Sequence, residues 1–214
     1  MWEDMFPYFK YQLSLYVMKL CFATNNKNKL EEVQEALGDT IALVGLKEIG
    51  CEEELPETQD TLEGNSLQKA SYVYEHFDID CFADDTGLEV AALDGAPGVY
   101  SARYAGDHRS KADNIQLLLD NLEDQKTPAD RAAQFRTVIT LMENGVPRQF
   151  EGIVKGHITA DLEGDGGFGY DPVFVPEGHN RTFAEMSMEE KNKISHRGRA
   201  VERLVQYLMD KAKG

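Results

Sequence analysis

Residues 19–37 read KLCFATNNKNKLEEVQEAL, the pattern of a buried strand, a polar turn and a helix. Residues 19–23 are a short, mostly apolar run, which predicts an interior strand. From residue 27 the apolar side chains recur at helical spacing, which predicts a helix as far as Leu37, and Gly38 ends it. A strand that passes through a turn into a helix is typical of an α/β fold.

The remaining pattern mixes further strands and helices with one hairpin. Further strands are predicted at residues 41–46, 81–83 and 88–93, and further helices at 62–77, 110–122 and 197–212. We expect an exposed acidic loop over residues 52–63 and a turn at Gly87 between two of the strands. Residues 135–142 and 148–154 flank Asn144-Gly145, which predicts an antiparallel hairpin that residues 155–160 can extend. Because crossover units and a hairpin occur together, the sequence predicts an α/β fold with a mixed sheet.

The composition fits one globular domain with an acidic surface. The chain has 214 residues and a formal net charge of −16, and we assign residues 18–214 to a single domain after an extension, 1–17, of unknown role. That charge argues against a nucleic-acid groove, but a magnesium ion and local cations can still hold a nucleotide. No apolar run approaches the roughly 20 residues of a membrane span. Three cysteines without metal-ligand spacing predict free thiols in a reducing cytoplasm.

The turn after the first strand is a candidate phosphate site. Six polar residues occupy it, namely Thr24, Asn25, Asn26, Lys27, Asn28 and Lys29. The start of a helix offers unpaired N–H groups that suit phosphate oxygens, and Lys29 can add a charge. The simpler interpretation, that Thr24 or Asn26 only caps the helix, is the stronger one for this segment taken alone.

Two acidic segments can supply a metal ligand or a base. Asp84 and Asp85 follow the predicted strand at 81–83, where open α/β sheets bind ligands. Paired carboxylates there can hold magnesium, or one can accept a proton from water; the alternative is an acidic turn. Glu57 lies in the acidic loop, and its role depends on whether that loop folds back over Asp85.

Two segments late in the chain can recognise a base. The first is the run Phe168, Gly169, Tyr170 and Asp171. It combines a flexible backbone, stacking rings and an acceptor, although a hairpin turn with core aromatics is the alternative. In the second segment, Ser195 can cap the last helix, which leaves Arg197 in the first turn with its charge opposing the helix dipole. That inconsistency indicates an anion or a base carbonyl near Arg197.

Taken together, these segments resemble the inosine triphosphate pyrophosphatase family over about residues 18–209. The motifs that carry the resemblance are residues 24–29 (TNNKNK), Glu57-Thr58 with Asn65 and Lys69, residues 83–88 (ADDTGL), residues 95–104 (GAPGVYSARY), residues 168–172 (FGYDP) and Ser195-His196-Arg197. Each motif alone is weak, and their order and spacing carry the match. The chain departs from the family pattern at Asn25, where glycine is common, and at Gly64, where many relatives carry an acid.

The resemblance implies an elongated, two-lobed α/β fold with a long mixed central sheet flanked by helices, and a homodimer. It also implies that Asp85 is the general base and that Glu57 and Asp85 bind Mg²⁺. The implied substrate contacts are Thr24, Asn25, Asn26, Lys27, Asn28, Lys29, Lys69, Thr86, Phe168, Gly169, Tyr170, Asp171, Lys191, His196 and Arg197.

The activity implied by the resemblance is hydrolysis of non-canonical purine nucleoside triphosphates (ITP, dITP, XTP) to the monophosphate and pyrophosphate. Hypoxanthine and xanthine carry an oxygen at C6, which donors from His196 or Arg197 can pair with, whereas adenine carries an amino group there. Guanine shares that oxygen, so its rejection stays open. Two alternatives are a Maf-like nucleotide pyrophosphatase of different base preference, whose first loop is serine- and arginine-rich, and a nucleotide-binding regulatory module without turnover.

Overall fold

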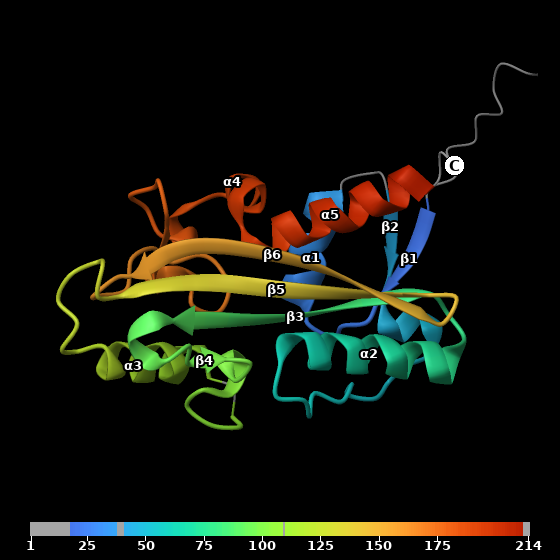
Figure 1. The fold of residues 1–214 in the computed structure, drawn as a ribbon, viewed down its shortest axis with the longest axis horizontal. Coiled ribbons are helices and arrows are strands. Elements are labelled where there is room, and N and C mark those ends of the chain that lie inside the picture. Colours follow the sequence, from blue (N-terminus) through green and yellow to red (C-terminus); the bar gives the residue numbers. More distant parts are fainter. Residues whose placement is uncertain (1–17, 38–40, 109, 212–214) are drawn as a thin grey trace, which may run out of the picture.

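A computed structural model describes residues 18–37, 41–108 and 110–211, and the extension 1–17 lies outside them. The strands are β1 (Met18–Phe22), β2 (Ile41–Val44), β3 (Cys81–Val90), β4 (Pro97–Gly98), β5 (Ala132–Glu143), β6 (Val146–Ile158) and β7 (Phe174–Pro176). The helices are α1 (Lys27–Leu37), α2 (Leu62–Phe77), α3 (Lys111–Asn121), α4 (Met188–Ile194) and α5 (His196–Lys211). The strands form one sheet of order β2-β1-β3-β5-β6-β7, with β4 paired to β3. Since β1 runs parallel to its neighbours and the other pairs are antiparallel, the predicted mixed α/β sheet is confirmed (Figure 1).

The first strand, turn and helix form as predicted. β1 lies between β2 and β3 in the sheet. Phe22 of β1 stacks on Phe82 of β3 with ring centroids 4.4 Å apart, and Val33 of α1 is buried in the same apolar cluster. This burial of apolar surface holds α1 against the sheet and so fixes the turn that connects β1 to α1.

The turn predicted at Gly87 is wrong. β3 continues through it for 10 residues and pairs with β5 from end to end. Glycine is required here for a close approach, because a Cβ at Gly87 would lie 2.6 Å from the carbonyl oxygen of Gly98 in β4. The strand predicted at 88–93 therefore ends at Val90, and Ala91–Leu93 is a short 3-10 helix. Asp84 and Asp85 consequently lie inside a strand and point to opposite faces of the sheet.

The predicted hairpin is confirmed and is longer than expected. Asn144 and Gly145, with φ of 51° and 75°, form the turn between β5 and β6. These positive φ values suit the turn types that match the twist of paired strands. The two strands run for 12 and 13 residues and form the long axis of the molecule (Figure 1).

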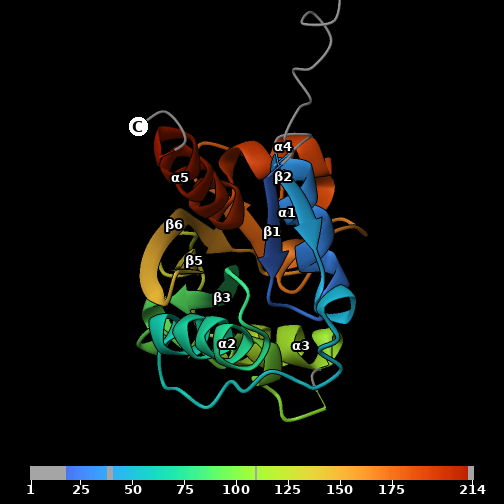
Figure 2. The ribbon, with the colours of Figure 1, turned by 90° about the vertical axis from the view of Figure 1, so that its right-hand side faces the viewer.

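Helices cover both faces of the sheet (Figures 1 and 2). α5 packs on β5 and β6 beside α1, and α2 packs on β3 and β5 from the opposite side. α3 lies on the same side as α2, at the other end of the sheet. The short helix α4 was not predicted; it begins at a capping box formed by Ser187 and Glu190. This arrangement brings the turn before α1 and the start of α5 close together above β3.

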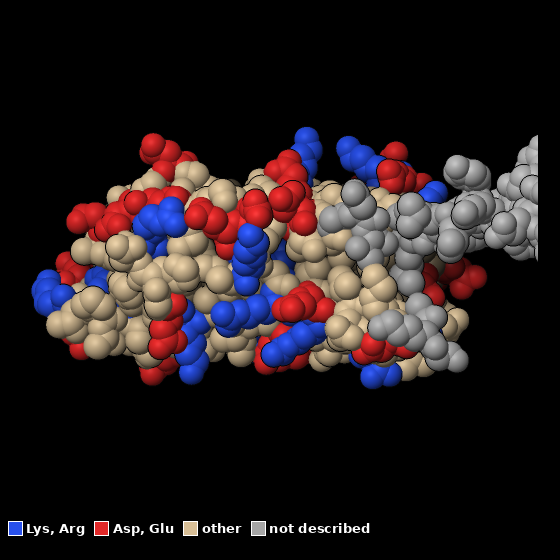
Figure 3. All heavy atoms as spheres, turned by 90° about the horizontal axis from the view of Figure 1, so that it is seen from above, with Lys and Arg blue, Asp and Glu red and all other residues tan. Residues whose placement is uncertain are grey.

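The side of the molecule that carries α4 and α5 shows acidic and basic side chains interspersed (Figure 3). Lys193 and Glu189 of α4, for example, pair at 2.6 Å. Among the described residues, no helix is both long and apolar enough to span a membrane.

Candidate active site

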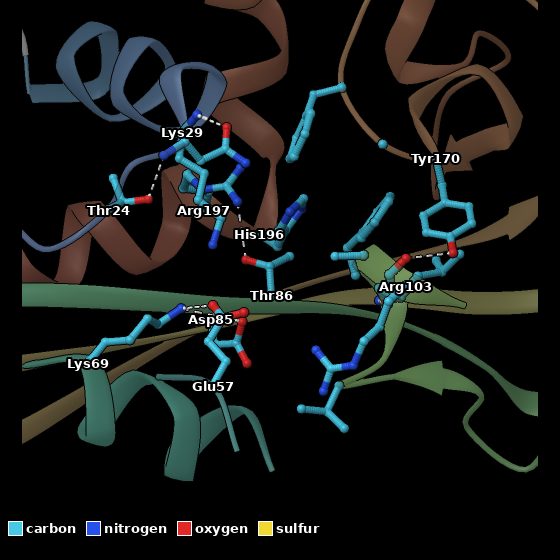
Figure 4. Close-up of a pocket in the computed structure, with 18 of the residues that line it drawn as sticks. Thr24, Lys29, Glu57, Lys69, Asp85, Thr86, Arg103, Tyr170, His196 and Arg197 are labelled. Atoms are coloured by element: carbon cyan, nitrogen blue, oxygen red, sulfur yellow. Dashed lines mark hydrogen bonds and ion pairs between the residues drawn. The ribbon is translucent and has the colours of Figure 1, made fainter. Parts of the chain in front are cut away.

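A pocket opens beside β3 and reaches both faces of the strand, bounded by the starts of α1 and α5 on one side and by α2 on the other (Figure 4). Of the predicted site residues, its lining includes Thr24, Asn25, Asn26, Lys29, Glu57, Lys69, Asp85, Thr86, Phe168, Gly169, Tyr170, Asp171, Lys191, His196 and Arg197. Lys27 and Asn28 are exposed and do not line the pocket. Segments far apart in the sequence therefore converge on one cavity.

The first end of the pocket is the turn that begins α1. Asn26 Oδ1 accepts hydrogen bonds from the backbone N–H groups of Asn28 and Lys29, at 3.1 and 3.3 Å. Thr24 Oγ1 accepts from the backbone N–H of Asn26 at 3.2 Å. The capping interpretation is therefore correct for Asn26. It does not exclude a phosphate contact, because the turn lines the pocket at the positive end of the helix dipole.

Asp84 and Asp85 have opposite environments because they alternate across β3. Asp84 is almost completely buried and binds Lys29 Nζ at 2.9 Å and Arg197 Nε at 3.2 Å. Burial alone would raise the pKa of Asp84, but Lys29 and Arg197 outweigh it and hold that pKa well below its usual range. Asp85 faces the pocket, and burial raises its pKa against the opposing effect of Lys69 and Lys29. Asp84 is thus fixed as an anion, while Asp85 is the better proton acceptor.

The carboxylates of Glu57 and Asp85 lie on either side of the Lys69 ammonium group. Lys69 Nζ lies 2.5 Å from Glu57 Oε1 and 3.7 Å from Asp85 Oδ1, and Asp85 Oδ2 accepts from Asn65 Nδ2 at 3.1 Å. Burial opposes the charge of Lys69, but Asp85 and Glu57 outweigh it, so the pKa of Lys69 is raised. The acidic loop therefore folds back over Asp85, the condition on which the role of Glu57 depended.

This carboxylate pair fits a magnesium ion. Mg²⁺ in phosphate-processing sites is bound by one or two carboxylates, with water and substrate oxygens completing its octahedron. Within residues 18–37, 41–108 and 110–211, no group of three or more His, Cys, Asp or Glu side chains is arranged to hold a metal ion. Glu57 and Asp85 therefore match an ion shared with a substrate, and not an ion enclosed by protein alone.

The second end of the pocket is the loop before β7. Tyr170 is buried and its hydroxyl donates to the carbonyl oxygen of Ser101 at 2.8 Å. Asp171 Oδ2 accepts from the backbone N–H of Phe168 at 2.5 Å and from Lys191 Nζ at 2.7 Å. Tyr170 and Asp171 thus fix the conformation of the loop. The half-buried ring of Phe168 is the flat side chain that the loop contributes to the pocket lining.

The start of α5 completes this end. Ser195 Oγ accepts from the backbone N–H of Gly198 at 3.0 Å and caps the helix as predicted. Arg197 donates to Glu32, to Asp84 Oδ2 at 3.2 Å and to Thr86 Oγ1 at 3.2 Å. The anions that its position in the first turn indicated are therefore protein carboxylates. They outweigh the effect of burial and raise the pKa of Arg197.

His196 carries an unpaired polar atom in the pocket wall. Its ring stacks on Phe135 with centroids 4.6 Å apart and 15° between the planes. Burial, together with the charges of Arg197 and Lys191, lowers the pKa of His196 well below 6.5, so the ring is neutral. Its Nδ1 is buried and has no hydrogen-bond partner among the described residues. Such an atom costs free energy unless a ligand satisfies it.

Three residues of the site were missed from the sequence: Glu32, Arg103 and Phe135. Nothing in the sequence around Glu32 distinguishes it from its acidic neighbour Glu31, yet it is 4% exposed and binds both Lys191 and Arg197. Phe135 was read only as a strand residue. Arg103 belongs to a motif of the resemblance, but nothing in its spacing assigned it a contact; it lines the pocket.

The fold and the pocket together indicate the class of protein. A helix start and two lysines beside paired carboxylates suit a phosphorylated ligand, and the aromatic side chains and the imidazole that line the other end suit a flat ring. The protein is thus an α/β protein with a pocket of nucleotide-binding character. The chain belongs to the Ham1 family, whose model matches residues 20–207.

Individual relatives agree with this assignment. The chain is 53% identical over 191 residues to the dITP/XTP pyrophosphatase of Flavobacterium johnsoniae, a match that covers 89% of this chain and 98% of that protein. It is also 53% identical to the dITP/XTP pyrophosphatase of Porphyromonas gingivalis, covering 89% and 97%. The solved structure of a HAM1 protein from Coxiella burnetii shares 40% identity and a TM-score of 0.82, covering 90% of this chain and 99% of that one. The predicted family resemblance is confirmed.

Proposed function

We propose that this chain is a magnesium-dependent pyrophosphohydrolase that converts dITP, XTP and ITP to the monophosphate and pyrophosphate. The observation that carries the proposal is that Glu57 and Asp85 both approach Lys69 in the pocket whose opposite wall is lined by His196 and Arg197. Relatives named dITP/XTP pyrophosphatase align over nearly their whole length, which supports this substrate class.

In this proposal Asp85 accepts the proton of the attacking water. Asp85 lines the pocket, where its carboxylate can accept a proton from a bound water. Asn65 donates to the other carboxylate oxygen at 3.1 Å and so keeps the side chain oriented. Glu57 and Asp85 would hold Mg²⁺, which supplies positive charge to the phosphate oxygens when it is bound.

Two lysines attract the phosphate chain. Lys69 stands between the carboxylates, and Lys29 lies in the first turn of α1 with its Nζ 2.9 Å from Asp84 Oδ1. Both can stabilise negative charge on the leaving pyrophosphate. The N–H groups of the turn at the start of α1 add donors of fixed direction.

Base selection rests on His196 and Arg197. Three N–H groups of Arg197 donate to Glu32, Asp84 and Thr86, and a guanidinium carries five, so two have no hydrogen-bond partner in the part of the chain that the structure describes. An oxygen at C6 of the base can pair with such donors, whereas the amino group of adenine would leave them unpaired. Each unmatched buried donor costs about 1–3 kcal/mol, which is enough for strong discrimination.

A pyrophosphate-release assay over a panel of triphosphates tests the proposal. With magnesium present, dITP, XTP and ITP should be hydrolysed far faster than dATP and dGTP, and a chelator should stop release. Hydrolysis of all five at similar rates would contradict the assignment of base selection to this pocket. Binding of dITP without any release would favour a regulatory module.

We also propose that the enzyme is a cytoplasmic homodimer in which residues 18–214 form one domain. All three cysteines are free and buried, which suits a reducing compartment. Burial raises the pKa of Cys21 to about 11 and that of Cys81 to about 12, so both stay as inert thiols. Light scattering on the purified chain gives the oligomeric state directly.

A further inference from the structure

Arg103 is a positively charged residue that lines the pocket, and the proposed reaction does not yet assign it a role. It ends the 3-10 turn Ser101–Arg103, between β4 and α3. In Figure 4 its side chain extends from the wall that carries Tyr170 towards the side of the pocket where Glu57 lies. Arg103 is therefore located between the aromatic end of the pocket and its carboxylates.

Its charge differs from those of the other cations of the pocket. Lys29 pairs with Asp84, Lys69 with Glu57, Lys191 with Glu32, and Arg197 with both Glu32 and Asp84. The guanidinium of Arg103 instead lies over the ring of Tyr100, 5.2 Å from its centroid. Among the described residues, no carboxylate pairs with it. Arg103 is thus a cation in the pocket wall whose hydrogen-bond donors face no protein anion in the described part of the chain.

The segment that presents Arg103 is firmly held. Ser101 Oγ accepts from the backbone N–H of Leu88 at 2.8 Å and donates to the carbonyl oxygen of Gly98 at 2.6 Å. The carbonyl oxygen of Ser101 accepts from the Tyr170 hydroxyl at 2.8 Å. The turn is therefore tied to β3, to β4 and to the aromatic loop, so its position does not depend on a ligand.

We infer that Arg103 binds the phosphate attached to the sugar, the α-phosphate of the triphosphate and the only phosphate of the product. This inference rests on the proposed function. In a nucleotide the α-phosphate lies between the base and the outer phosphates, and Arg103 lies between Tyr170 and Glu57. A guanidinium offers paired N–H donors that match two phosphate oxygens. Since attack at the α-phosphorus develops charge on those same oxygens, Arg103 stabilises the transition state as well as the product complex.

The test compares Arg103→Ala, Arg103→Lys and the control Arg148→Ala with the wild-type chain. Arg148 also stacks on a tyrosine, 4.6 Å from the ring centroid of Tyr207, and it does not line the pocket. Each protein is assayed with magnesium for kcat and KM on dITP. Inhibition constants are measured for dIMP, deoxyinosine and pyrophosphate, and thermal melts check the fold.

For Arg103→Ala we expect kcat on dITP to fall about 100-fold, the scale of removing one donor from a transition state. The inhibition constant of dIMP should rise about tenfold, while those of deoxyinosine and pyrophosphate stay unchanged. Arg103→Lys should recover part of the dIMP affinity, because it keeps the charge and loses the paired donors. Arg148→Ala should match the wild type.

An unchanged dIMP constant in Arg103→Ala overturns the inference, as does an equal loss for deoxyinosine, which would place the guanidinium on the base. A loss confined to pyrophosphate would assign Arg103 to the leaving group and also overturns it. The wild-type assay distinguishes failure of the proposed function from failure of the assignment of Arg103. If the wild type releases no pyrophosphate from dITP, the proposed function fails; if it does and Arg103→Ala equals it, only the inference fails.

Discussion

Two charge clusters border the pocket, and they differ in burial. The clamp comprises Glu32, Asp84, Asp171, Lys191 and Arg197, whose side chains are between 1% and 6% exposed. The open cluster comprises Glu57, Lys69 and Asp85, whose side chains are 28%, 6% and 11% exposed, so the difference in burial lies mainly in Glu57, which solvent reaches. The clamp joins α1, β3, α4, α5 and the 3-10 turn Asp171–Val173, whereas the open cluster lies between the acidic loop, α2 and β3.

The two clusters therefore suit different roles: the clamp positions the helices around the pocket, and the open cluster suits the proposed reaction. Breaking a buried ion pair leaves an uncompensated charge and costs about 3–5 kcal/mol, so the clamp has one stable arrangement. It holds the start of α5, and with it His196, against the turn before α1. The open cluster can exchange the ammonium of Lys69 for other cations, because solvent reaches Glu57. In the proposed function, the clamp therefore holds the charges that stay fixed, and the open cluster holds the charges that respond to substrate.

The largest effect is expected at the neighbours Asp84 and Asp85, one from each cluster. Asp85→Asn should lower kcat on dITP about 10³-fold, since the variant lacks the proposed base, with stability within about 1 kcal/mol of wild type. Asp84→Asn should cost about 3 kcal/mol of stability, because Lys29 and Arg197 lose their shared anion. Steady-state kinetics and urea unfolding measure both. Equal stability losses at the two positions would abolish the distinction between the clusters.

The clamp is tested most cleanly at Glu32. Glu32→Gln keeps the shape of the side chain and removes the anion that binds Lys191 and Arg197, so we expect a loss of about 3 kcal/mol. Glu35→Gln makes the same change at an exposed position of α1 and should stay within about 0.5 kcal/mol of wild type. Urea midpoints that coincide for the two variants would show that the clamp does not stabilise the fold.

His196 is the best probe of base selection. Arg197 is a poorer one, because its removal would also break the clamp. His196→Phe keeps a flat ring against Phe135 and removes both ring nitrogens, so the ratio of kcat/KM for dITP over dATP should fall about tenfold. His179→Phe makes the same change at an exposed site and serves as the control. An unaltered ratio in His196→Phe would show that the imidazole does not select the base.

The smallest effect is a pH dependence of stability that also originates at His196. Its pKa in the folded chain is well below 6.5, chiefly through burial, whereas in the unfolded chain it is about 6.5. Below that pH the unfolded chain binds a proton that the folded chain does not, so stability falls as pH falls. We expect about 1 kcal/mol less stability at pH 5.5 than at pH 7.5. The decrease should be absent in His196→Phe, and its persistence there would assign it to another group.

Local patterns in the sequence predicted much of the fold. The strand, turn and helix at residues 19–37 and the hairpin at Asn144-Gly145 each depend on short-range preferences, and both form as expected. The capping box of Ser187 and Glu190 was also a local signal for α4, and it was overlooked. Pocket residues were predicted because they belong to motifs whose order matches a family.

Features that depend on distant contacts could not be predicted this way. Gly87 has the local signature of a turn, but the approach of Gly98 decides its conformation. Glu32 has the signature of a solvated helix face, yet Lys191 and Arg197 arrive from the other end of the chain. Arg131 has no local signal of burial, yet it is buried and donates to the carbonyl oxygens of Ile158 and Thr159 at 2.8 and 2.6 Å.

The central claim is that the enzyme breaks the bond between the α-phosphorus and the bridging oxygen of the leaving pyrophosphate. Transfer of labelled oxygen from water to the products identifies that bond directly. Wild-type chain is incubated with dITP and magnesium in water enriched in oxygen-18, and the products are separated and weighed by mass spectrometry. Attack on the α-phosphorus predicts one labelled oxygen in dIMP and none in pyrophosphate. Label in pyrophosphate, or in orthophosphate released with dIDP, would contradict the mechanism.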